Sequence, residues 1–262
     1  MTRSTKGRLD ITILGSGTCV PSLRRSSCAL LMETGGLKWL FDCGAGTLRR
    51  LLEAGTEIFE IDAVFLSHFH PDHTGELASF LFATKYPDGD LRKNPLKIVA
   101  GTGFLNFFEG LKKAFGEWIV LAPDLLEIIE LDTAGPDRRT LGSIIVESAP
   151  MAHNPESLGY RVTAPGGVSA VYSGDTDYTE NLIALAEKCD LLICESALPD
   201  DLNTAGHLTP SRAGNIAAEA KAAELILTHF YPECDHADIV AECRKTYAGD
   251  RKSTRLNSSH YS

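Results

Sequence analysis

The sequence lacks any apolar run long enough to cross a membrane. Its longest apolar segments, such as IDAVFL at 61–66 and DLLIC at 190–194, have the length of strands, whereas a membrane-spanning helix needs about 20 apolar residues. The first ten residues, MTRSTKGRLD, also lack the apolar stretch of a secretory signal. We therefore expect a protein of the cytoplasm that has no membrane partner.

Paired cysteines and an excess of positive charge are missing as well. The seven cysteines are odd in number and form no CxxC pair, which favours free thiols over a disulfide framework. The formal net charge is -10, so unspecific attraction to nucleic acid or to an anionic membrane should be weak. A polyanionic substrate would therefore need a local attractor, such as a bound pair of metal ions.

What the chain does have is a composition typical of globular proteins, with 262 residues, 44% of them hydrophobic and 23% charged. Apolar segments of strand length predict strands at 9–14, 27–34, 37–42, 61–67, 96–100, 125–131, 141–150, 168–175, 190–196 and 224–229. Helical spacing and capping residues predict helices at 46–55, 74–86, 103–116, 179–189, 209–223 and 236–247. Because strands precede helices in both halves, we expect one domain made of two similar α/β halves.

The C-terminal segment DRKSTRLNSSH, at 250–260, matches the translation of a common DNA sequencing adapter. We therefore predict a single domain over residues 1–249 and a non-native tail over 250–262, which includes His260. The natural C-terminus, with a final strand, is expected to be missing.

The densest local feature is the segment SHFHPDH at 67–73, which holds three of the eight histidines. His68 and His70 lie two residues apart at the end of a predicted strand, so their side chains should point the same way. Asp72 and His73 follow through a proline turn. Imidazole nitrogens and carboxylate oxygens are ligands that suit zinc or iron. Four ligands so close together can hardly all bind one tetrahedral ion, which favours a pair of metal ions.

Three further candidate ligands follow later strands. His153 in AHN, Asp175 in SGDT and His229 in THF each come just after a predicted strand, and loops at strand ends carry sites on a rigid scaffold. Either histidine alone would more often be a hydrogen-bonded structural residue. Their recurrence at corresponding positions makes metal binding the better interpretation, and the sequence predicts a dinuclear metal site.

The GSG at 15–17 follows a strand, as the first glycines of a dinucleotide-binding loop do. Val20 stands where the third glycine should be, and no helix clearly begins there, so we interpret GSG as a tight turn near the metal site. Arg24 and Arg25, slightly further on, either meet a phosphate or form an ordinary pair of surface arginines.

The segments HFHPDH, AHN, SGDT and THF together resemble the metallo-β-lactamase superfamily, and the resemblance runs from about residue 9 to 247. It implies an α/β fold, a four-layer αββα sandwich in which two mixed β-sheets lie between helices. The segments LGSGTCVPSLRRSS, FDCGAGTLRRLL and GHLTPSRAGNIAAEA look most like the ribonuclease Z branch. Members of that branch are metal-dependent phosphodiesterases that trim tRNA precursors on the 3′ side, and the resemblance also suggests a homodimer.

The resemblance implies roles for individual residues. One metal ion would be held by His68, His70 and His153, the other by Asp72, His73 and His229, with Asp175 as the bridge. The catalytic residues would be His207 as proton donor, Glu195 as the acid that orients it, and Asp72. Asp42 is a plausible acceptor for a ligand imidazole, with a turn carboxylate as the alternative. The ions would be Zn²⁺, with Mn²⁺ or iron as alternatives.

We therefore expect a hydrolase that cleaves a phosphodiester through a metal-bridging hydroxide. The substrate would be a small diester, a cyclic nucleotide or an RNA 3′ end. The segment GYRVTAPGGVSAVYSGDT, at 159–176, has no room for the arm with which ribonuclease Z grips tRNA, which argues against tRNA. The alternative is a hydrolase of an ester, lactone, thioester or β-lactam. A redox enzyme would need a flavin domain, and a noncatalytic scaffold would normally have lost ligands.

Overall fold

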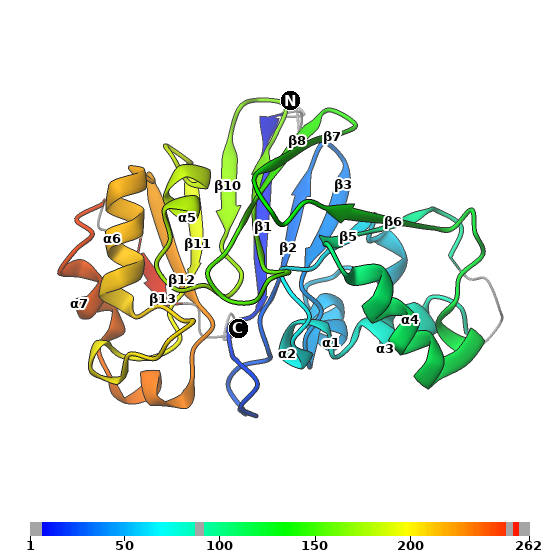
Figure 1. Cartoon of the computed structure of the whole chain (residues 1–262), viewed down its shortest axis with the longest axis horizontal. Coiled ribbons are helices and arrows are strands. Elements are labelled where there is room, and N and C mark those ends of the chain that lie inside the picture. The colour runs from blue at the N-terminus through cyan, green and yellow to red at the C-terminus, as the bar shows by residue number, and fades with distance from the viewer. Residues whose placement is uncertain (1–6, 87–91, 250–253, 257–262) are drawn as a thin grey trace.

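The computed structural model describes residues 7–86, 92–249 and 254–256, whose strands form two sheets (Figure 1). One sheet contains β1 (Leu9–Gly15), β2 (Ala29–Thr34), β3 (Leu37–Phe41), β4 (Ala63–Phe65), β5 (Leu96–Gly101) and β6 (Leu126–Leu131). The other contains β7 (Asp137–Leu141), β8 (Ile144–Pro150), β9 (Leu158–Thr163), β10 (Ser169–Tyr172), β11 (Leu191–Glu195), β12 (Glu224–Thr228) and β13 (Thr254–Leu256).

Both sheets are mixed, and their strand orders mirror each other. The first runs β1-β2-β3-β4-β5-β6, antiparallel from β1 to β3 and parallel from β3 to β6. The second runs β13-β12-β11-β10-β9-β8-β7, antiparallel from β7 to β10 and parallel from β10 to β13. The two similar halves expected from the sequence are therefore present.

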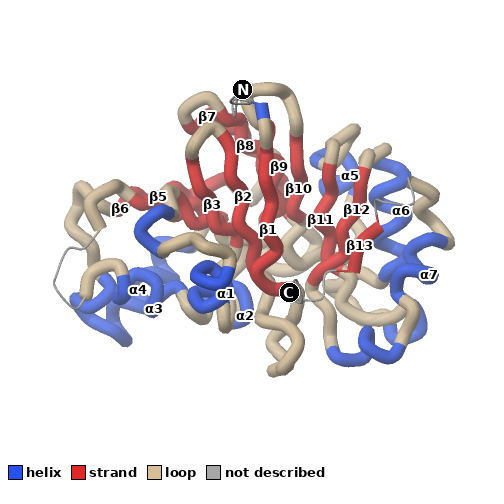
Figure 2. The backbone as a smooth tube through the Cα atoms, turned by 180° about the vertical axis from the view of Figure 1, so that it is seen from behind, coloured by secondary structure: helices blue, strands red, loops and turns tan. Residues whose placement is uncertain are grey.

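Helices cover the outer face of each sheet (Figure 2). The first sheet carries α1 (Thr47–Glu53), α2 (Pro71–Thr74), α3 (Leu77–Ala83) and α4 (Phe104–Phe115), with the short 3₁₀ segments η2 (Ile58–Glu60) and η3 (Gly116–Ile119). The second sheet carries α5 (Glu180–Leu185), α6 (Pro210–Ala220) and α7 (Ile239–Arg244), with η4 (Asp200–Leu202) and η5 (Pro232–His236).

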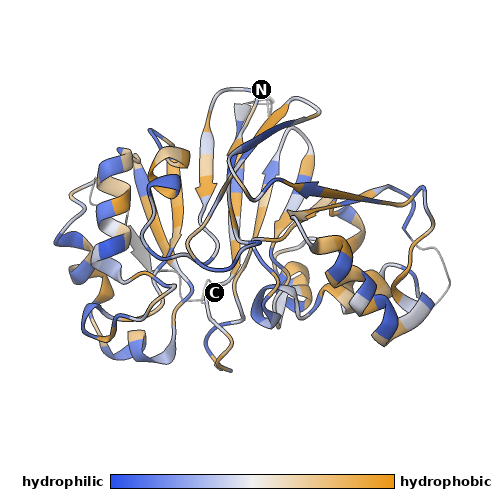
Figure 3. Cartoon of the chain, in the orientation of Figure 1, coloured by the Kyte–Doolittle hydropathy of each residue, from blue (hydrophilic) through white to orange (hydrophobic). Residues whose placement is uncertain are grey.

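Three hydrophobic cores hold these layers together. On β2, Leu30 and Met32 belong to the core between the sheets, whereas Ala29 and Leu31 belong to the core under α1, α3 and α4. This alternation follows from the two-residue repeat of a strand. A third core lies between the second sheet and α5 to α7. Figure 3 shows the corresponding hydrophobic colouring along the strands and the mixed colouring of α6. The predicted four-layer αββα sandwich is confirmed.

The structure differs from the sequence-based elements in two places. Strand β7 was not predicted; it forms a hairpin with β8 around Gly142, which adopts a left-handed φ of 64°. The helix predicted over 74–86 is shorter, because α3 spans Leu77–Ala83 and Thr74 belongs to the separate short helix α2. Between these two helices, the Glu76 carboxylate accepts hydrogen bonds from the backbone N–H groups of Gly46 and Leu48 at the start of α1.

Two expectations from composition bear on the described residues. All seven cysteines are free, as expected. No helix in the described ranges is both long and apolar enough to span a membrane.

The C-terminal tail is described only at β13, which lies beside β12. Residues 250–253 and 257–262, which include His260, lie outside the described residues. A single domain over 1–249 with a non-native tail therefore stays a prediction.

Candidate metal centre

The histidine-rich segment 67–73 leaves the buried strand β4 and enters α2. His70 is the N-cap of α2 with an extended backbone, and Pro71 occupies the first helical turn, where its missing N–H costs nothing. The His70 carbonyl accepts hydrogen bonds from the N–H groups of His73 and Thr74. This short turn places Asp72 and His73 beside His68 and His70, as the spacing of the motif predicts.

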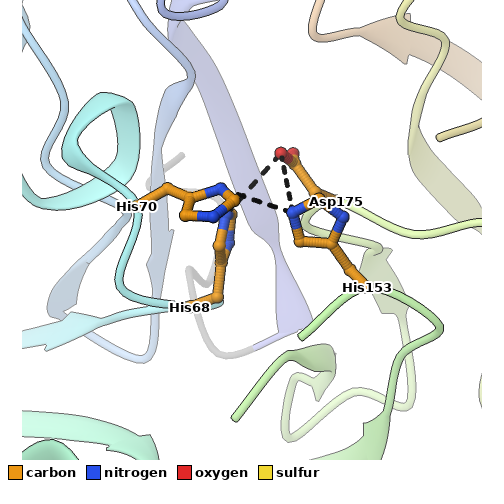
Figure 4. Close-up of side chains that lie close together, drawn as sticks. All are labelled: His68, His70, His153 and Asp175. Atoms are coloured by element: carbon orange, nitrogen blue, oxygen red, sulfur yellow. Dashed lines mark hydrogen bonds and ion pairs between the residues drawn. The ribbon is translucent and has the colours of Figure 1, made fainter. Parts of the chain in front are cut away.

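The other candidate residues come from the second sheet. His153 follows β8, Asp175 follows β10, and His229 follows β12 directly. Figure 4 shows His68 and His70 from one half of the molecule facing His153 and Asp175 from the other. The candidate residues therefore come from both sheets, and segments far apart in the sequence meet at one place.

Asp175 lies at the centre of this group. Its Oδ2 atom is 3.2 Å from His229 Nε2, 3.7 Å from His68 Nε2 and 3.9 Å from His153 Nε2, and its Oδ1 atom is 3.3 Å from His73 Nε2. Asp72 Oδ2 lies 3.6 Å from His229 Nε2 and 3.8 Å from His73 Nε2. Distances of this size separate ligand atoms that share one ion, because each metal–ligand bond is only about 2.0–2.2 Å long.

The possible ligand atoms fall into two main groups, within each of which they lie within 4.8 Å of one another. The first group is His68, His70, His153 and Asp175, and the second is Asp72, His73 and His229. Asp175 also groups with His207 and His229, so its carboxylate reaches both sides. The structure thus brings all seven residues together in the division implied by the resemblance; their function as ligands remains a proposal.

The chemistry of the cluster fits divalent cations. The Nε2 atoms of His68, His73 and His229 and the Oδ1 atom of Asp175 are buried and have no hydrogen-bond partner among the described residues. Burying polar atoms without partners costs about 1–3 kcal/mol each. These four atoms lie close together in the cluster, and a metal ion would give them a partner.

Most of the imidazoles are oriented by a contact on their other nitrogen. His73 Nδ1 lies 2.8 Å from Asp42 Oδ2, and His153 Nδ1 lies 2.9 Å from the Gly206 carbonyl. His70 presents Nδ1 to the cluster, and its Nε2 lies 3.0 Å from the Asn154 side-chain amide. Such partners fix the ring orientation and the tautomer of a metal ligand.

Asp42 is the most connected of these partners. It is fully buried and accepts hydrogen bonds from the Ser67 N–H at 2.7 Å, the Ser67 hydroxyl at 2.9 Å and the Tyr172 hydroxyl at 2.6 Å. Its backbone has a left-handed φ of 58° and that of His229 a φ of 60°, which are uncommon for residues with side chains. The predicted contact of Asp42 with an imidazole of this cluster is present, and His73 is its partner.

Burial and neighbouring charges set the protonation of the group. Burial, and then the charge of His73, hold the pKa of His68 well below its usual value, so its ring is neutral. Burial raises the pKa of Asp175, but the charges of His229 and His73 outweigh it and hold this pKa well below its usual value. A neutral imidazole and an ionised carboxylate are the forms that bind a cation.

His73 is the exception. Burial lowers its pKa, but the carboxylates of Asp175 and Asp42 outweigh burial and raise the pKa well above its usual value. The ring therefore carries a proton that a metal ion must displace, and metal binding should release it.

Beside the cluster, the partly buried His207 pairs with the fully buried Glu195. His207 Nδ1 lies 3.0 Å from Glu195 Oε1, and the fully buried Glu195 also accepts hydrogen bonds from the N–H groups of Thr176 and Leu208. Burial lowers the pKa of His207, but the hydrogen bond and charge of Glu195 outweigh it and raise the pKa to about 9. His207 is therefore protonated at neutral pH, which suits a proton donor. Its place beside Asp175 and His229 agrees with the expected location.

The remaining motifs also lie close to this centre. GSG packs tightly: a Cβ atom on Gly15 would lie 1.9 Å from the Ser27 carbonyl oxygen, and Gly17 bridges to Phe230, the residue after His229. The interpretation as a tight turn near the site agrees with these contacts. Arg25 is not a surface arginine, because its side chain is only 8% exposed, whereas the side chain of Arg24 is 69% exposed.

Sequence reasoning did not identify Asn154, Gly206 or Tyr172 as part of the centre. Asn154 directly follows a candidate ligand, and Gly206 directly precedes the candidate proton donor. Both neighbours are visible in the sequence, but a contact made by a carbonyl group or an amide carries no residue pattern that could be found there.

Comparisons with known proteins agree with the fold and the motifs. The β-lactamase superfamily domain matches residues 38–230. A ribonuclease Z of Mycobacterium bovis (strain BCG) is 30% identical over 248 residues, covering 86% of this chain and 86% of that protein. The metallo-β-lactamase fold protein YhfI from Bacillus subtilis is 25% identical, with a TM-score of 0.80 and 97% coverage of each chain. The short form of human tRNase Z is 27% identical, with a TM-score of 0.70, and covers 84% of this chain and 92% of that one.

Proposed function

The chain belongs to the metallo-β-lactamase superfamily and is similar to ribonuclease Z, and from this premise we propose that it is a dinuclear metal-dependent phosphodiesterase. The observation that carries the proposal is the central place of Asp175 between the two groups of candidate ligands. One ion would be held by His68, His70 and His153, the other by Asp72, His73 and His229, and Asp175 would contact both. Zn²⁺ suits this set of nitrogen and oxygen ligands, with Mn²⁺ or iron as alternatives.

Two divalent ions in this position would supply Lewis acidity and lower the pKa of water towards about 7, so that hydroxide would be available as the nucleophile at neutral pH. The protein's own side chains would bind the ions and supply a proton. Burial raises the pKa of Asp72, but the neighbouring imidazoles of His229 and His73 outweigh burial and lower this pKa to about 2, so the carboxylate is ionised at neutral pH. It therefore has the charged form that binds a cation.

The pair of His207 and Glu195 suits the cleavage of a phosphodiester. An alkoxide that leaves a phosphodiester is a poor leaving group, so a proton donor at its oxygen lowers the barrier. His207 holds that proton on Nε2, because Nδ1 is committed to Glu195. Glu195 cannot move away, because two backbone N–H groups also bind it.

The substrate is proposed to be a small diester, a cyclic nucleotide or an RNA 3′ end. Strand β9 ends at Thr163 and β10 begins at Ser169, and the turn between them closes through hydrogen bonds of Ala164 with Val168 and Gly167. No long arm leaves the fold at this place, which favours a small diester over a whole tRNA. A homodimer, suggested by the resemblance, is part of the same proposal.

A parallel assay tests the bond class. The metal-loaded protein is offered an aryl phosphodiester, a precursor tRNA, cyclic nucleotides, a lactone and a β-lactam. We expect turnover of at least one phosphodiester and none of the acyl substrates. Turnover of the lactone or the β-lactam without diester cleavage would replace the proposal by the alternative, a hydrolase of an ester, lactone, thioester or β-lactam. Light scattering of the same sample measures the oligomeric state.

A further inference from the structure

A polar cavity lies beside the loop that follows β1. It has a volume of about 280 Å³, and its lining includes four arginines, Arg24, Arg25, Arg49 and Arg50, but only one carboxylate, Glu53. This local excess of positive charge contrasts with the formal net charge of -10 of the whole chain. The cavity is smaller than the roughly 300–1,000 Å³ of a site that encloses a drug-sized ligand, so it suits a small anionic group.

The arginines keep a surplus of positive charge after their internal ion pairs are considered. Arg49 and Arg50 both pair with Glu53. Arg24 and Arg25 both pair with Asp235, which comes from the η5 segment. Among the ion pairs between described residues, these four guanidinium groups contact two carboxylates. Guanidinium groups match the geometry of phosphate oxygens and bind them through paired hydrogen bonds.

Arg25 is the most buried of the four arginines. Its side chain is only 8% exposed, and its Nε atom is buried without a hydrogen-bond partner among the described residues. Its guanidinium group lies over the ring of Phe230, 5.4 Å from the ring centroid, and pairs with Asp235. These contacts hold one guanidinium group of the lining in place before any anion binds.

The wall of this cavity is also a wall of the candidate metal centre. Ser26, which lines the cavity, packs against Gly46, and its neighbour Ser27 packs against Gly44. A Cβ atom on Gly44 would lie 1.9 Å from the Asp72 carbonyl oxygen. On the other side, the ring under Arg25 belongs to the residue that follows His229. The arginine cavity therefore adjoins the candidate metal centre, with Ser26, Ser27 and the segment 44–46 between the two.

We propose that the arginine cavity binds a phosphate group of the substrate other than the one that is cleaved. The proposal rests on the proposed phosphodiesterase function. It assigns the substrate class more narrowly, to nucleotides that carry a phosphate next to the scissile diester. That second phosphate belongs either to a small nucleotide or to the backbone of an RNA strand.

Calorimetric binding to the metal-loaded protein tests the cavity without any need for turnover. The probes are thymidine 5′-monophosphate and thymidine 3′,5′-bisphosphate, which differ only in the second phosphate, and a five-nucleotide RNA. The test variant combines Arg24→Ala with Arg49→Ala, two exposed side chains outside the catalytic machinery. Arg138→Ala is the matched control, because Arg138 is also exposed but lies on β7 and pairs with Glu147.

We expect the double variant to lose about 10-fold in affinity for the bisphosphate, for the RNA or for both, and to bind the monophosphate like the control. A loss for the bisphosphate assigns the second phosphate to a small nucleotide, and a loss for the RNA alone assigns it to an RNA backbone. Unchanged affinity for both probes, or an equal loss for the monophosphate, overturns the proposal. Failure of the diesterase assays would leave these binding results valid, so the two proposals fail separately.

Discussion

Replacing His207 by alanine tests the proposed proton donor directly. The hydrogen bond and charge of Glu195 outweigh burial and raise the pKa of His207 to about 9, so at pH 7 the imidazole holds the proton that the leaving oxygen needs. Loss of a general acid lowers the rate by about 10²–10⁴, or about 2.7–5.5 kcal/mol in the barrier. The fold should tolerate the change, because Glu195 keeps its hydrogen bonds from the N–H groups of Thr176 and Leu208.

The size of the effect should depend on the leaving group. An aryl diester releases a stabilised phenolate that needs little protonation, so His207→Ala should lower kcat only slightly with this substrate. A nucleotide diester releases an alkoxide, and its kcat should fall by the full factor of about 10²–10⁴. Steady-state kinetics with both substrates are compared with His236→Ala, a control histidine that is exposed on η5, and metal content is measured in each sample. Equal losses for both substrates would refute the proton-donor role, and loss of metal would make His207 a ligand instead.

Three other perturbations have defined outcomes. Asp42→Asn removes the charge from a buried carboxylate that orients His73; we expect a loss of about 3–5 kcal/mol in unfolding free energy and of about 10–100-fold in metal affinity, measured by denaturation and metal competition. Glu195→Gln removes the negative charge of the carboxylate whose hydrogen bond and charge raise the pKa of His207; in a pH–rate profile, the decline expected as pH rises through about 9 should move to lower pH, and an unmoved decline would contradict the pairing. Removal of metal by a chelator should lower the Tm in scanning calorimetry, because an ion at 100 times its Kd stabilises by about 2.7 kcal/mol; an identical Tm would mean that the fold binds no ion.

Much of the fold was predictable because buried parallel strands carry a strong signal. Segments such as AVF at 63–65 and LLIC at 191–194 are apolar on both faces, since one core lies on each side of the sheet. Strand β7 was missed because its sequence DRRTL is polar and half-exposed at a sheet edge. The break between α2 and α3 was missed; Glu76, which lies in it, contacts the start of α1, and this contact joins residues about 30 positions apart that share no local sequence pattern.

The candidate site was predictable for a related reason. Histidines and aspartates that directly follow predicted strands can be recognised in the sequence, and the fold then brings them together. The partners that orient the imidazoles were harder to find. Asn154 and the Gly206 carbonyl belong to no chemical pattern, and Arg25 becomes significant only once Phe230 and Asp235 are seen to bury it.

Anomalous diffraction from crystals of the metal-loaded protein shows whether the seven side chains hold two metal ions. We predict two peaks per chain, one within His68, His70 and His153 and the other within Asp72, His73 and His229. Asp175 should lie within about 2.0–2.2 Å of both peaks. A single peak, or a second peak that Asp175 does not contact, would contradict this prediction.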